Sequence, residues 1–367
     1  MRRAAALIAG GGPAGSAAAI LLARGGAMPV LIERNREVPD IVCGGFLGAD
    51  AIACLARLGL DPAQLGARPI HQARLIAGRH SAEAALPFVA AGLSRRTLDR
   101  AMLEAAEAAG AMVEHGIAVK RIDPGTRCLH LSDETAIAAD ALFLATGKHE
   151  VRGLPRPVSA MADPALGLRV RLEPTPALAA ALDGVIELHL FDRGYAGLLT
   201  QEDGSVNLCV SVAQSRLTDA GGQPARLIES LAAEAPRLAE RFGAARAVGT
   251  WSSVARVPYG WRMRQGEPGL FRLGDQGAVI ASLAGDGIAI ALASATRAAH
   301  CFLEGGANAA IAFQTNFALR ARRPVGLANL LRHWGETPWI ARPLIGLLGH
   351  APGLIRQAAA MTRIGAG

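Results

Sequence analysis

The sequence lacks the cysteine and histidine patterns that mark disulfide-rich and metal-binding proteins. Its 5 cysteines are widely spaced without a Cys-x-x-Cys pair, and its 9 histidines form no His-x-x-x-His or His-Glu-x-x-His pattern. We therefore expect neither a disulfide framework nor a bound metal. The sequence also has no internal repeat and no low-complexity linker. Free cysteines are typical of a cytoplasmic protein, which is the location we expect.

Aromatic residues are scarce at 4%, whereas 51% of the 367 residues are hydrophobic and 19% are charged. Such a composition suits a globular protein of two domains or of one large composite domain. The formal net charge is +7, but the arginines are scattered and no basic block is interleaved with aromatic side chains. We therefore expect no nucleic-acid partner, because an anionic cofactor or an acidic membrane surface is enough to explain the charge.

The first 34 residues carry the most informative pattern. An apolar run, 4–9, leads into a glycine-rich turn, 10–15, an alanine-rich helical stretch and a second apolar run, 29–32, which ends at Glu33. Strand, glycine turn, helix, strand and acid follow one another in this order in a dinucleotide-binding βαβ unit. A signal peptide or short membrane span is the alternative, but three consecutive glycines and a proline would interrupt a hydrophobic helix there.

Each glycine of the turn is expected to have a separate task. Gly10 permits the tight turn, Gly12 lets backbone N–H groups approach a pyrophosphate, and Gly15 lets the helix pack closely on the strand. The helix N-terminus then turns its positive dipole end to the phosphates. Glu33, roughly 20 residues further on, can accept hydrogen bonds from an adenosine ribose.

The middle of the chain predicts a second kind of structure. Residues 70–77 and 80–86 predict a strand pair, and Ser94 is a good N-cap for a helix. Between 155 and 258 the pattern alternates as in antiparallel strands, with a hairpin turn at 202–205. One helix is expected over 224–235.

The nucleotide-binding pattern returns far downstream. Residues 140–147 predict a buried strand and turn, and 269–275 repeat a strand-and-turn motif of the first kind. An alanine-rich helix from 288 to about 303 follows. The nucleotide domain is therefore discontinuous. Such a layout favours FAD over NAD alone, because FAD must be held along its extended length.

On these motifs the chain resembles the glutathione-reductase-like FAD-dependent oxidoreductases. It is similar to the branch that includes p-hydroxybenzoate hydroxylase, flavin halogenases and geranylgeranyl reductases, over about residues 4–305. The resemblance implies a non-covalently bound FAD, which carries the redox step. It also implies NAD(P)H as a transient reductant, since no separate nicotinamide domain is visible.

The resemblance assigns cofactor contacts to several segments. Arg95 falls near the pyrophosphate, 145–147 match the middle motif, Asp275 would bond the ribityl chain, and 285–288 run into the helix beneath the flavin ring. The predicted cofactor-binding residues are Gly10, Gly12, Pro13, Ala14, Gly15, Glu33, Arg34, Cys43, Gly44, Arg95, Ala145, Thr146, Gly147, Gly274, Asp275, Gly285, Gly287 and Ile288. Backbone N–H groups of 286–288 would stabilise negative charge on the reduced flavin.

Three departures separate the chain from individual relatives. Thr146 stands where the hydroxylases have an aspartate, although Arg152 keeps the arginine position that follows. Trp251 stands alone where the halogenases have two tryptophans, so halogenation is not expected. Cys43-Gly44-Gly45 resembles the Cys-Gly-Gly of geranylgeranyl reductases, but 195–200 lack the tryptophan and proline of their substrate motif.

Two side chains are candidates to assist catalysis. Cys43 either lines the flavin pocket or is a buried small hydrophobic residue. Asp286 either takes part in proton transfer or caps the helix that follows. Neither alternative is excluded by the sequence.

The substrate is expected to be a hydrophobic aromatic, polyketide-like or isoprenoid molecule. The side chains expected on the far side of the flavin are Phe46, Leu47, Phe88, Leu190 and Leu198. Residues 327–364 form either an amphipathic lid or membrane-surface helix pair, or short helices packed over the substrate domain. Pro338, Pro343 and Pro352 favour the second alternative, and peripheral membrane contact stays open.

We therefore expect an α/β protein with a Rossmann-like FAD domain, made of a parallel sheet with a β-meander, an α+β antiparallel-sheet substrate domain and C-terminal helices. The predicted boundaries are 1–69, 93–154 and 265–305 for the FAD domain, 70–92 and 155–264 for the substrate domain, and 306–367 for the helical segment. An NAD(P)H-dependent monooxygenase is slightly preferred over a C=C reductase of the geranylgeranyl reductase type. A non-catalytic or membrane-inserted binding protein is the third alternative.

Overall fold

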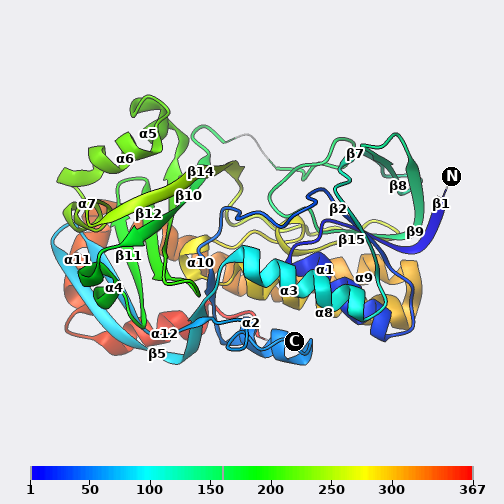
Figure 1. The fold of residues 1–367 in the computed structure, drawn as a ribbon, viewed down its shortest axis with the longest axis horizontal. Helices are drawn as coiled ribbons and strands as arrows, with labels where there is room; N and C mark the ends of the chain where they lie inside the picture. Colours follow the sequence, from blue (N-terminus) through cyan, green and yellow to red (C-terminus); the bar gives the residue numbers. More distant parts are fainter. Residues whose placement is uncertain (1, 159–160, 366–367) are drawn as a thin grey trace.

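The structure is a computed structural model that describes residues 2–158 and 161–365, and it is built around two sheets (Figure 1). The first sheet contains, in spatial order, β6 (Met112–His115), β2 (Val30–Glu33), β1 (Arg2–Ala9), β9 (Ala136–Leu144), β8 (Cys128–Leu131) and β7 (Val119–Asp123), with β15 (Leu270–Arg272) also paired to β9. Strands β6, β2, β1, β9 and β15 pair in parallel, whereas β7, β8 and β9 form an antiparallel meander. The predicted parallel sheet with a β-meander is confirmed.

One face of the first sheet is covered by α1 (Pro13–Arg24), α3 (Arg95–Ala108) and α8 (Gly287–Gly305), and α2 (Ala49–Arg57) lies beside α8. Helices α1 and α8 pack closely because most of their buried side chains are alanine. The other face packs against the meander in a separate apolar cluster. The result is a three-layer domain in which the β1–α1 turn opens at the carboxyl end of the parallel strands.

The second sheet is antiparallel except for the parallel pair β11–β4. Its strands, in spatial order, are β14 (Ala245–Val257), β10 (Ala165–Pro174), β13 (Val206–Ala213), β12 (Gly194–Thr200), β11 (Val185–Phe191), β4 (Arg68–Ala77), β5 (His80–Gly92) and β3 (Phe46–Leu47). The predicted hairpin turn at 202–205 joins β12 to β13, which confirms it. The predicted antiparallel second sheet is likewise confirmed.

Short helices cover the outer face of this sheet. They are α4 (Pro176–Ala181), α5 (Gln214–Asp219), α6 (Pro224–Ser230) and α7 (Pro236–Gly243). The prediction of one helix over 224–235 is wrong, because α6 ends at Ser230, a 3-10 turn (Leu231–Ala233) follows, and Pro236 begins a new helix. The residue before a proline is disfavoured in the helical conformation, so the chain leaves the helix at Ala235, and Pro236 begins the next one.

Four further helices follow α8: α9 (Ala310–Arg320), α10 (Arg322–Gly335), α11 (Pro338–Leu348) and α12 (Pro352–Met361). Helices α11 and α12 pack on β4 and β5, where Ala341, Ile345 and Ile355 share an apolar cluster with Leu190. Of the two alternatives for this segment, the structure therefore shows packing over the second sheet. Across residues 2–158 and 161–365, no helix combines the length and the apolar character needed to span a membrane.

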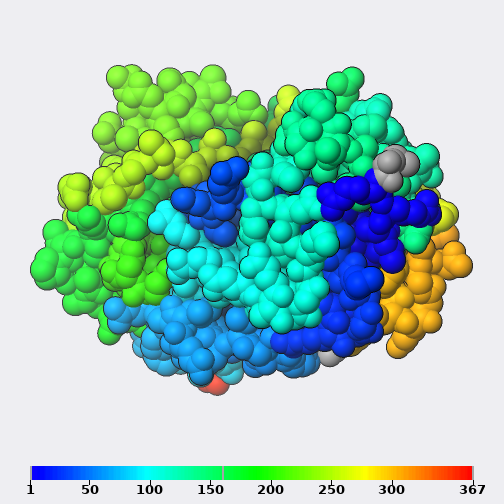
Figure 2. Space-filling model, turned by 45° about the vertical axis from the view of Figure 1, so that its right-hand side comes forward, coloured from blue at the N-terminus to red at the C-terminus, as the bar shows by residue number. Residues whose placement is uncertain are grey.

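The two sheets are bound together by the loop that follows β2. Figure 2 shows this loop, in blue, at the surface between the green helices and strands of the second sheet and the cyan α3. Within it, Asp40 pairs with Arg169 on β10 at 3.2 Å and with Arg96 on α3 at 3.2 Å. The loop therefore has anchors on both sides, which fixes Cys43 at its end.

Candidate functional site

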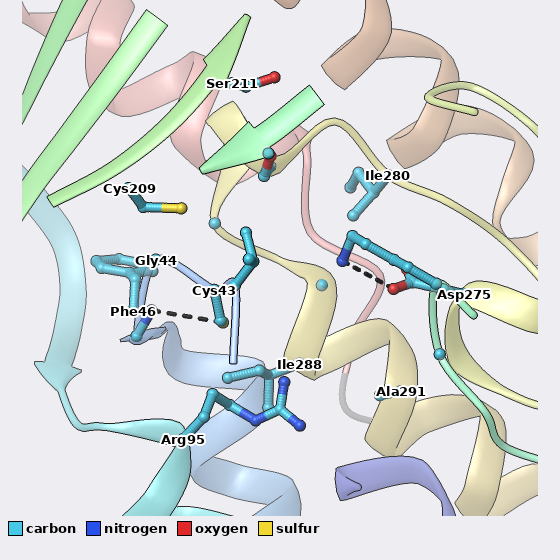
Figure 3. A pocket seen from close by; sticks show the side chains of 18 of the residues that line it. Cys43, Gly44, Phe46, Arg95, Cys209, Ser211, Asp275, Ile280, Ile288 and Ala291 are labelled. Carbon is cyan, nitrogen blue, oxygen red and sulfur yellow. Dashed lines mark hydrogen bonds and ion pairs between the residues drawn. The ribbon is translucent and has the colours of Figure 1, made fainter. Parts of the chain in front are cut away.

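A cavity of about 960 Å³ lies between the two sheets. One end reaches the glycine turn between β1 and α1, and the other is enclosed by β4, β11, β12, β13 and the helices α10–α12. In the close view, Cys209 and Ser211 from the second sheet lie opposite Asp275 and Ile280, with Cys43 between them (Figure 3). The volume of the cavity falls in the range of cofactor and ligand sites.

Every predicted cofactor-binding residue except Gly15 lines this cavity. The fold thus gathers segments near positions 12, 33, 44, 95, 146, 275 and 287 around one space. Gly15 lies behind the turn, where an added Cβ would collide with the carbonyl oxygen of Gly10. That position agrees with the close helix–strand packing expected of it. The contacts of these residues with a cofactor stay predictions.

The glycine turn leaves room for a ligand. An added Cβ at Gly12 would meet only Nη2 of Arg95, at 3.3 Å, so the space above this residue is open to the cavity. No side chain caps the N-terminus of α1. The first N–H groups of a helix need acceptors, and an anionic group seated on the turn would supply them. The turn therefore fits the pyrophosphate of a dinucleotide.

Glu33 also holds the glycine turn itself. Its Oε2 accepts a hydrogen bond from the N–H of Gly11 at 2.7 Å. Its Oε1 accepts from the backbone N–H of Asn35 at 2.9 Å and from the Asn35 amide at 2.6 Å. A carboxylate has about four acceptor positions, so one is left for a ribose hydroxyl. The link from Glu33 to the turn was not apparent from the sequence.

Arg95 is held over the glycine turn by Asp99, at the start of a helix that Glu202 anchors. The predicted N-cap is confirmed, since Ser94 Oγ accepts from the N–H of Thr97 at 3.1 Å. Glu202, in the β12–β13 turn, accepts from the N–H of Ser94 at 2.8 Å. Arg95 in turn donates to Asp99 from Nε at 2.7 Å. Burial raises the pKa of Asp99, although Arg95 opposes this effect. The guanidinium group therefore has a fixed position facing the cavity.

Lys148 is a cavity residue that the sequence interpretation missed. Its Nζ lies 2.9 Å from Oδ2 of Asp275. Burial would lower the pKa of Lys148, but the charge of Asp275 outweighs it and holds the pKa above its ordinary value. Arg156 braces both residues by donating to the carbonyl of Lys148 at 2.9 Å and to that of Asp275 at 3.0 Å. A signal was present, because Lys148 directly follows the middle motif.

Cys43 lines the cavity at the end of the loop after β2. Asn207 on β13 donates to the carbonyls of Cys43, at 2.9 Å, and Gly44, at 2.8 Å. Gly45 has φ +73° and its N–H lies 3.5 Å from the sulfur of Cys43. The loop therefore presents the sulfur to the cavity by a turn that glycine permits. Across the cavity, burial raises the pKa of Cys209 to about 12, so this second thiol stays protonated.

Asp286 lies behind the loop 285–288. It is fully buried, it is not part of the cavity lining, and it pairs with Arg363. Asp286 occupies the N-cap position of α8, but its side chain makes no capping hydrogen bond, so the structure does not support the capping alternative. Burial raises its pKa to about 7, against the lowering effect of Arg363. This location does not favour its predicted part in proton transfer. Gly287, by contrast, lines the cavity, and an added Cβ there would meet nothing within 4 Å. The start of α8 is therefore open to the cavity.

Comparison with known proteins shows which proteins share this fold. Residues 5–170 match the family described as pyridine nucleotide-disulphide oxidoreductase. No curated protein matches the chain. The flavin-dependent brominase Bmp2 superposes with a TM-score of 0.80 at 16% identity, covering 98% of this chain and 93% of that one. The chain has the fold of the FAD-dependent oxidoreductases.

Two other solved structures agree with this assignment. A geranylgeranyl bacteriochlorophyll reductase-like protein from Thermoplasma acidophilum has a TM-score of 0.71 at 17% identity, covering 98% of this chain and all of that one, 100%. PqsL from Pseudomonas aeruginosa, in complex with 2-aminobenzoylacetate, has a TM-score of 0.69 at 17% identity, covering 93% of this chain and 99% of that one. The resemblance noted in the sequence is therefore confirmed at the level of the fold.

The apolar end of the cavity in this FAD-dependent oxidoreductase fold differs in part from the expectation. Phe46 and Leu190 line the cavity as predicted, but Leu47 and Leu198 are fully buried in the cores behind it. Successive side chains of a strand point to opposite faces, and on β12 Tyr195 faces the cavity while Leu198 faces the outer helices. The predictions for Leu47 and Leu198 are wrong for this reason. Phe88, also outside the lining, stacks on Arg363 at 3.9 Å.

The C-terminal helices α10–α12 cover the apolar end of the cavity, and the sequence had left their role open. Trp334 of α10, Ile345 and Leu348 of α11, and Ile355 of α12 all line the cavity. Opposite them lies Leu190 of β11. The C-terminal helices thus close the space over the second sheet.

Proposed function

We propose that the protein is an FAD-dependent oxidoreductase that acts on a hydrophobic small molecule as an NAD(P)H-dependent monooxygenase. One observation carries the proposal. A continuous cavity joins a dinucleotide-type glycine turn to an apolar chamber enclosed by the second sheet and by α10–α12. A cofactor held along the first part would present its reactive end to a molecule in the second.

The residues that would hold FAD follow from this geometry. The turn at Gly12 and the guanidinium of Arg95 would take the pyrophosphate, and Glu33 would take the adenosine ribose. Asp275 would take the ribityl chain, with Lys148 beside it. Bound there, FAD would supply the redox chemistry, accepting hydride from NAD(P)H and passing electrons to oxygen. The N–H groups at the start of α8 would stabilise negative charge at the ring.

The apolar chamber supports the monooxygenase assignment. Hydroxylation needs a site from which water is excluded, because water would divert the activated oxygen. The chamber is lined by apolar side chains such as Leu190, Ile345 and Trp334, and the C-terminal helices cover it. PqsL is itself described as a probable FAD-dependent monooxygenase, and it shares this fold.

The proposed reaction consumes one O₂ and one NAD(P)H. One oxygen atom enters a C–H bond of the substrate. The other leaves as water, whose two hydrogens balance the one hydride of NAD(P)H and one proton, and NAD(P)⁺ is released. The test is to release the cofactor and identify it, then to follow NAD(P)H oxidation under ¹⁸O₂ with extracts of hydrophobic metabolites. The proposal predicts released FAD and a product that is heavier by one ¹⁸O atom. A colourless protein that takes up no FAD would overturn it.

A C=C reductase is the second candidate, and the position of Cys43 favours it. Cys43-Gly44-Gly45 lines the cavity, and one structural neighbour is described as geranylgeranyl reductase-like. In this reaction hydride from NAD(P)H and a proton add across a double bond, without oxygen. Substrate consumption under strictly anaerobic conditions would establish the reductase and exclude the monooxygenase.

A further inference from the structure

The chain contains two tyrosines, and both belong to one row of hydrogen-bonded hydroxyl groups in the cavity. Tyr195 on β12 and Tyr259 after β14 both contact Oγ of Ser282, at 2.5 Å and 2.6 Å. Ser211 on β13 donates to the hydroxyl of Tyr259 at 3.3 Å. We call these four side chains the hydroxyl row. It joins the second sheet to the segment that leads into the loop 285–288.

The hydroxyl row can offer a proton to a ligand. Three hydrogen bonds join its four hydroxyl groups, and the hydroxyls of Tyr195 and Tyr259 also interact with each other. Because a hydroxyl hydrogen rotates, Tyr195, Ser282 or Tyr259 can turn its proton to a ligand oxygen in place of a neighbour in the row. Burial raises the pKa of Tyr195 well above its ordinary value, so this phenol keeps its proton. An oxygen atom that enters the apolar cavity loses its hydration, and a hydrogen bond from the row offsets that loss.

The surroundings of the hydroxyl row carry no free charge. Among the described lining residues that the second sheet and α10–α12 contribute, none is charged. Arg363 lines the cavity beyond α12, but it is paired with Asp286. Arg332 lies over the ring of Tyr259 at 5.2 Å, but it pairs with Glu336 at 2.9 Å. Lys148, near Tyr259, is neutralised by Asp275. A carboxylate in this chamber would therefore lose its hydration without gaining a cation.

We infer that the hydroxyl row binds an oxygen atom of the substrate, and that the substrate is a neutral, largely apolar molecule with a hydroxyl or carbonyl group. The inference rests on the proposed function, in that the chamber beside the flavin site is taken as the substrate site. A hydrogen bond from the row gives the oxygen a fixed place close to the loop 285–288. The row therefore sets which part of an otherwise apolar molecule faces the flavin site.

Three probes with the same ring system test the inference: 2-naphthol, naphthalene and 2-naphthoate. Their binding to the purified holoprotein is measured by equilibrium dialysis, with the free probe quantified by absorbance. A neutral hydrogen bond predicts that 2-naphthol binds about three- to tenfold more tightly than naphthalene. The missing cation predicts that 2-naphthoate binds at least about tenfold more weakly than 2-naphthol.

Variants that remove single hydroxyl groups assign the preference to the row. Tyr259→Phe should reduce the ratio of 2-naphthol to naphthalene affinity to about one while leaving naphthalene binding unchanged. Tyr195→Phe should act in the same direction, and it covers the case in which Tyr259→Phe folds poorly. Ser252→Ala is the matched control, because Ser252 lines the same cavity outside the row. It should keep the parental ratio.

The outcomes separate this inference from the proposed function. Tightest binding of 2-naphthoate, an unchanged ratio in both tyrosine variants, or no binding of any probe up to its solubility limit would overturn the inference. Dialysis does not depend on the flavin, and the FAD content is measured separately from the released cofactor. A protein that lacks FAD but shows the 2-naphthol preference would overturn only the oxidoreductase assignment.

Discussion

The guanidinium group of Arg363 is paired with the carboxylate of Asp286, 77 residues earlier in the chain. Arg363 also fills the space above Gly48, where an added Cβ would collide with it. Two residues later, the N–H of Gly365 donates to Asp50 at the start of α2 at 2.8 Å. The segment after α12 therefore holds the N-terminal ends of α2 and α8 in place. Because α8 begins at the loop 285–288, this segment also positions one wall of the proposed flavin site.

We predict that Arg363→Met destabilises the protein by about 3–5 kcal/mol, because it leaves the buried Asp286 without its partner. It should also weaken FAD retention, since the loop 285–288 loses its support. Unfolding in urea measures the first effect, and the FAD content of the purified protein measures the second. Arg356→Met, on the exposed face of α12, is the control and should change stability by less than about 0.5 kcal/mol. Equal stability of the two variants would show that the pair is unimportant.

Gly12 and Gly15 should respond differently to a side chain. Gly12→Val should abolish FAD binding with little effect on the fold, because the added atoms enter space that the protein leaves open. Gly15→Ala should instead lower the melting temperature, since its Cβ would collide with the carbonyl of Gly10. Circular dichroism melting and FAD content distinguish the two effects. Normal FAD occupancy in Gly12→Val would remove the pyrophosphate assignment.

Lys148→Met should make the flavin harder to reduce. Lys148 keeps its charge because its pKa is held above the ordinary value, and it neutralises Asp275. Its removal leaves a carboxylate near the proposed flavin site, and the charge of that carboxylate opposes the negative charge of the reduced form. We expect the potential to fall by about 30 mV or more, which for two electrons is about 1.4 kcal/mol. Lys120→Met is the control, since the chain's other lysine is exposed on β7 and pairs with Glu134. Equal potentials in both variants would place Lys148 away from the ring.

Glu187 should make the protein sensitive to acid. It is fully buried on β11 and accepts hydrogen bonds from Arg74 at 2.7 Å, from Arg241 at 2.9 Å and from His189 at 2.8 Å. Burial acts to raise its pKa, but the bonds from His189, Arg241 and Arg74 prevail and hold it well below the ordinary 4.5. The folded state therefore binds this proton less tightly than the unfolded state does.

The stability that Glu187 contributes is thus fully present above about pH 4.5 and is lost progressively as the pH falls below it. Glu187→Gln removes this titration, although it also weakens the protein at neutral pH. We expect the free energy of unfolding of the parent to fall more steeply with acid than that of the variant. Urea unfolding between pH 3 and pH 7 measures the difference, on the order of 1.4 kcal/mol per pKa unit. Parallel curves would contradict the prediction.

Local pattern was enough to predict the parts of the site that one stretch of chain builds. The strand, turn and helix around Gly12 and the N-cap at Ser94 depend on neighbours a few residues apart, so spacing and residue type specify them. The partners that hold these parts come from elsewhere. Glu202 reaches Ser94 across 108 residues, and Lys148 reaches Asp275 across 127. Nothing in the local pattern of either residue indicates such a pairing.

The sequence also did not show which side chains of a strand face the cavity. Leu198 lies in a strand that is buried on both sides, so an uninterrupted apolar run gave no sign of which residues face the cavity. The hydroxyl row was missed for a related reason, because its four members come from different segments of the chain.

The hydrogen bond between Gly365 and Asp50 spans 315 residues. The order in which the residues are synthesised therefore affects when the cofactor site is complete. Asp50 leaves the ribosome early, whereas the residues that close the wall behind α8 are among the last described here to be made. During synthesis, therefore, the glycine turn is complete long before the far wall exists. We expect a nascent chain to bind the adenosine end of a dinucleotide but not to enclose its other end. We expect retention of the whole molecule only after residue 365 has emerged from the exit tunnel.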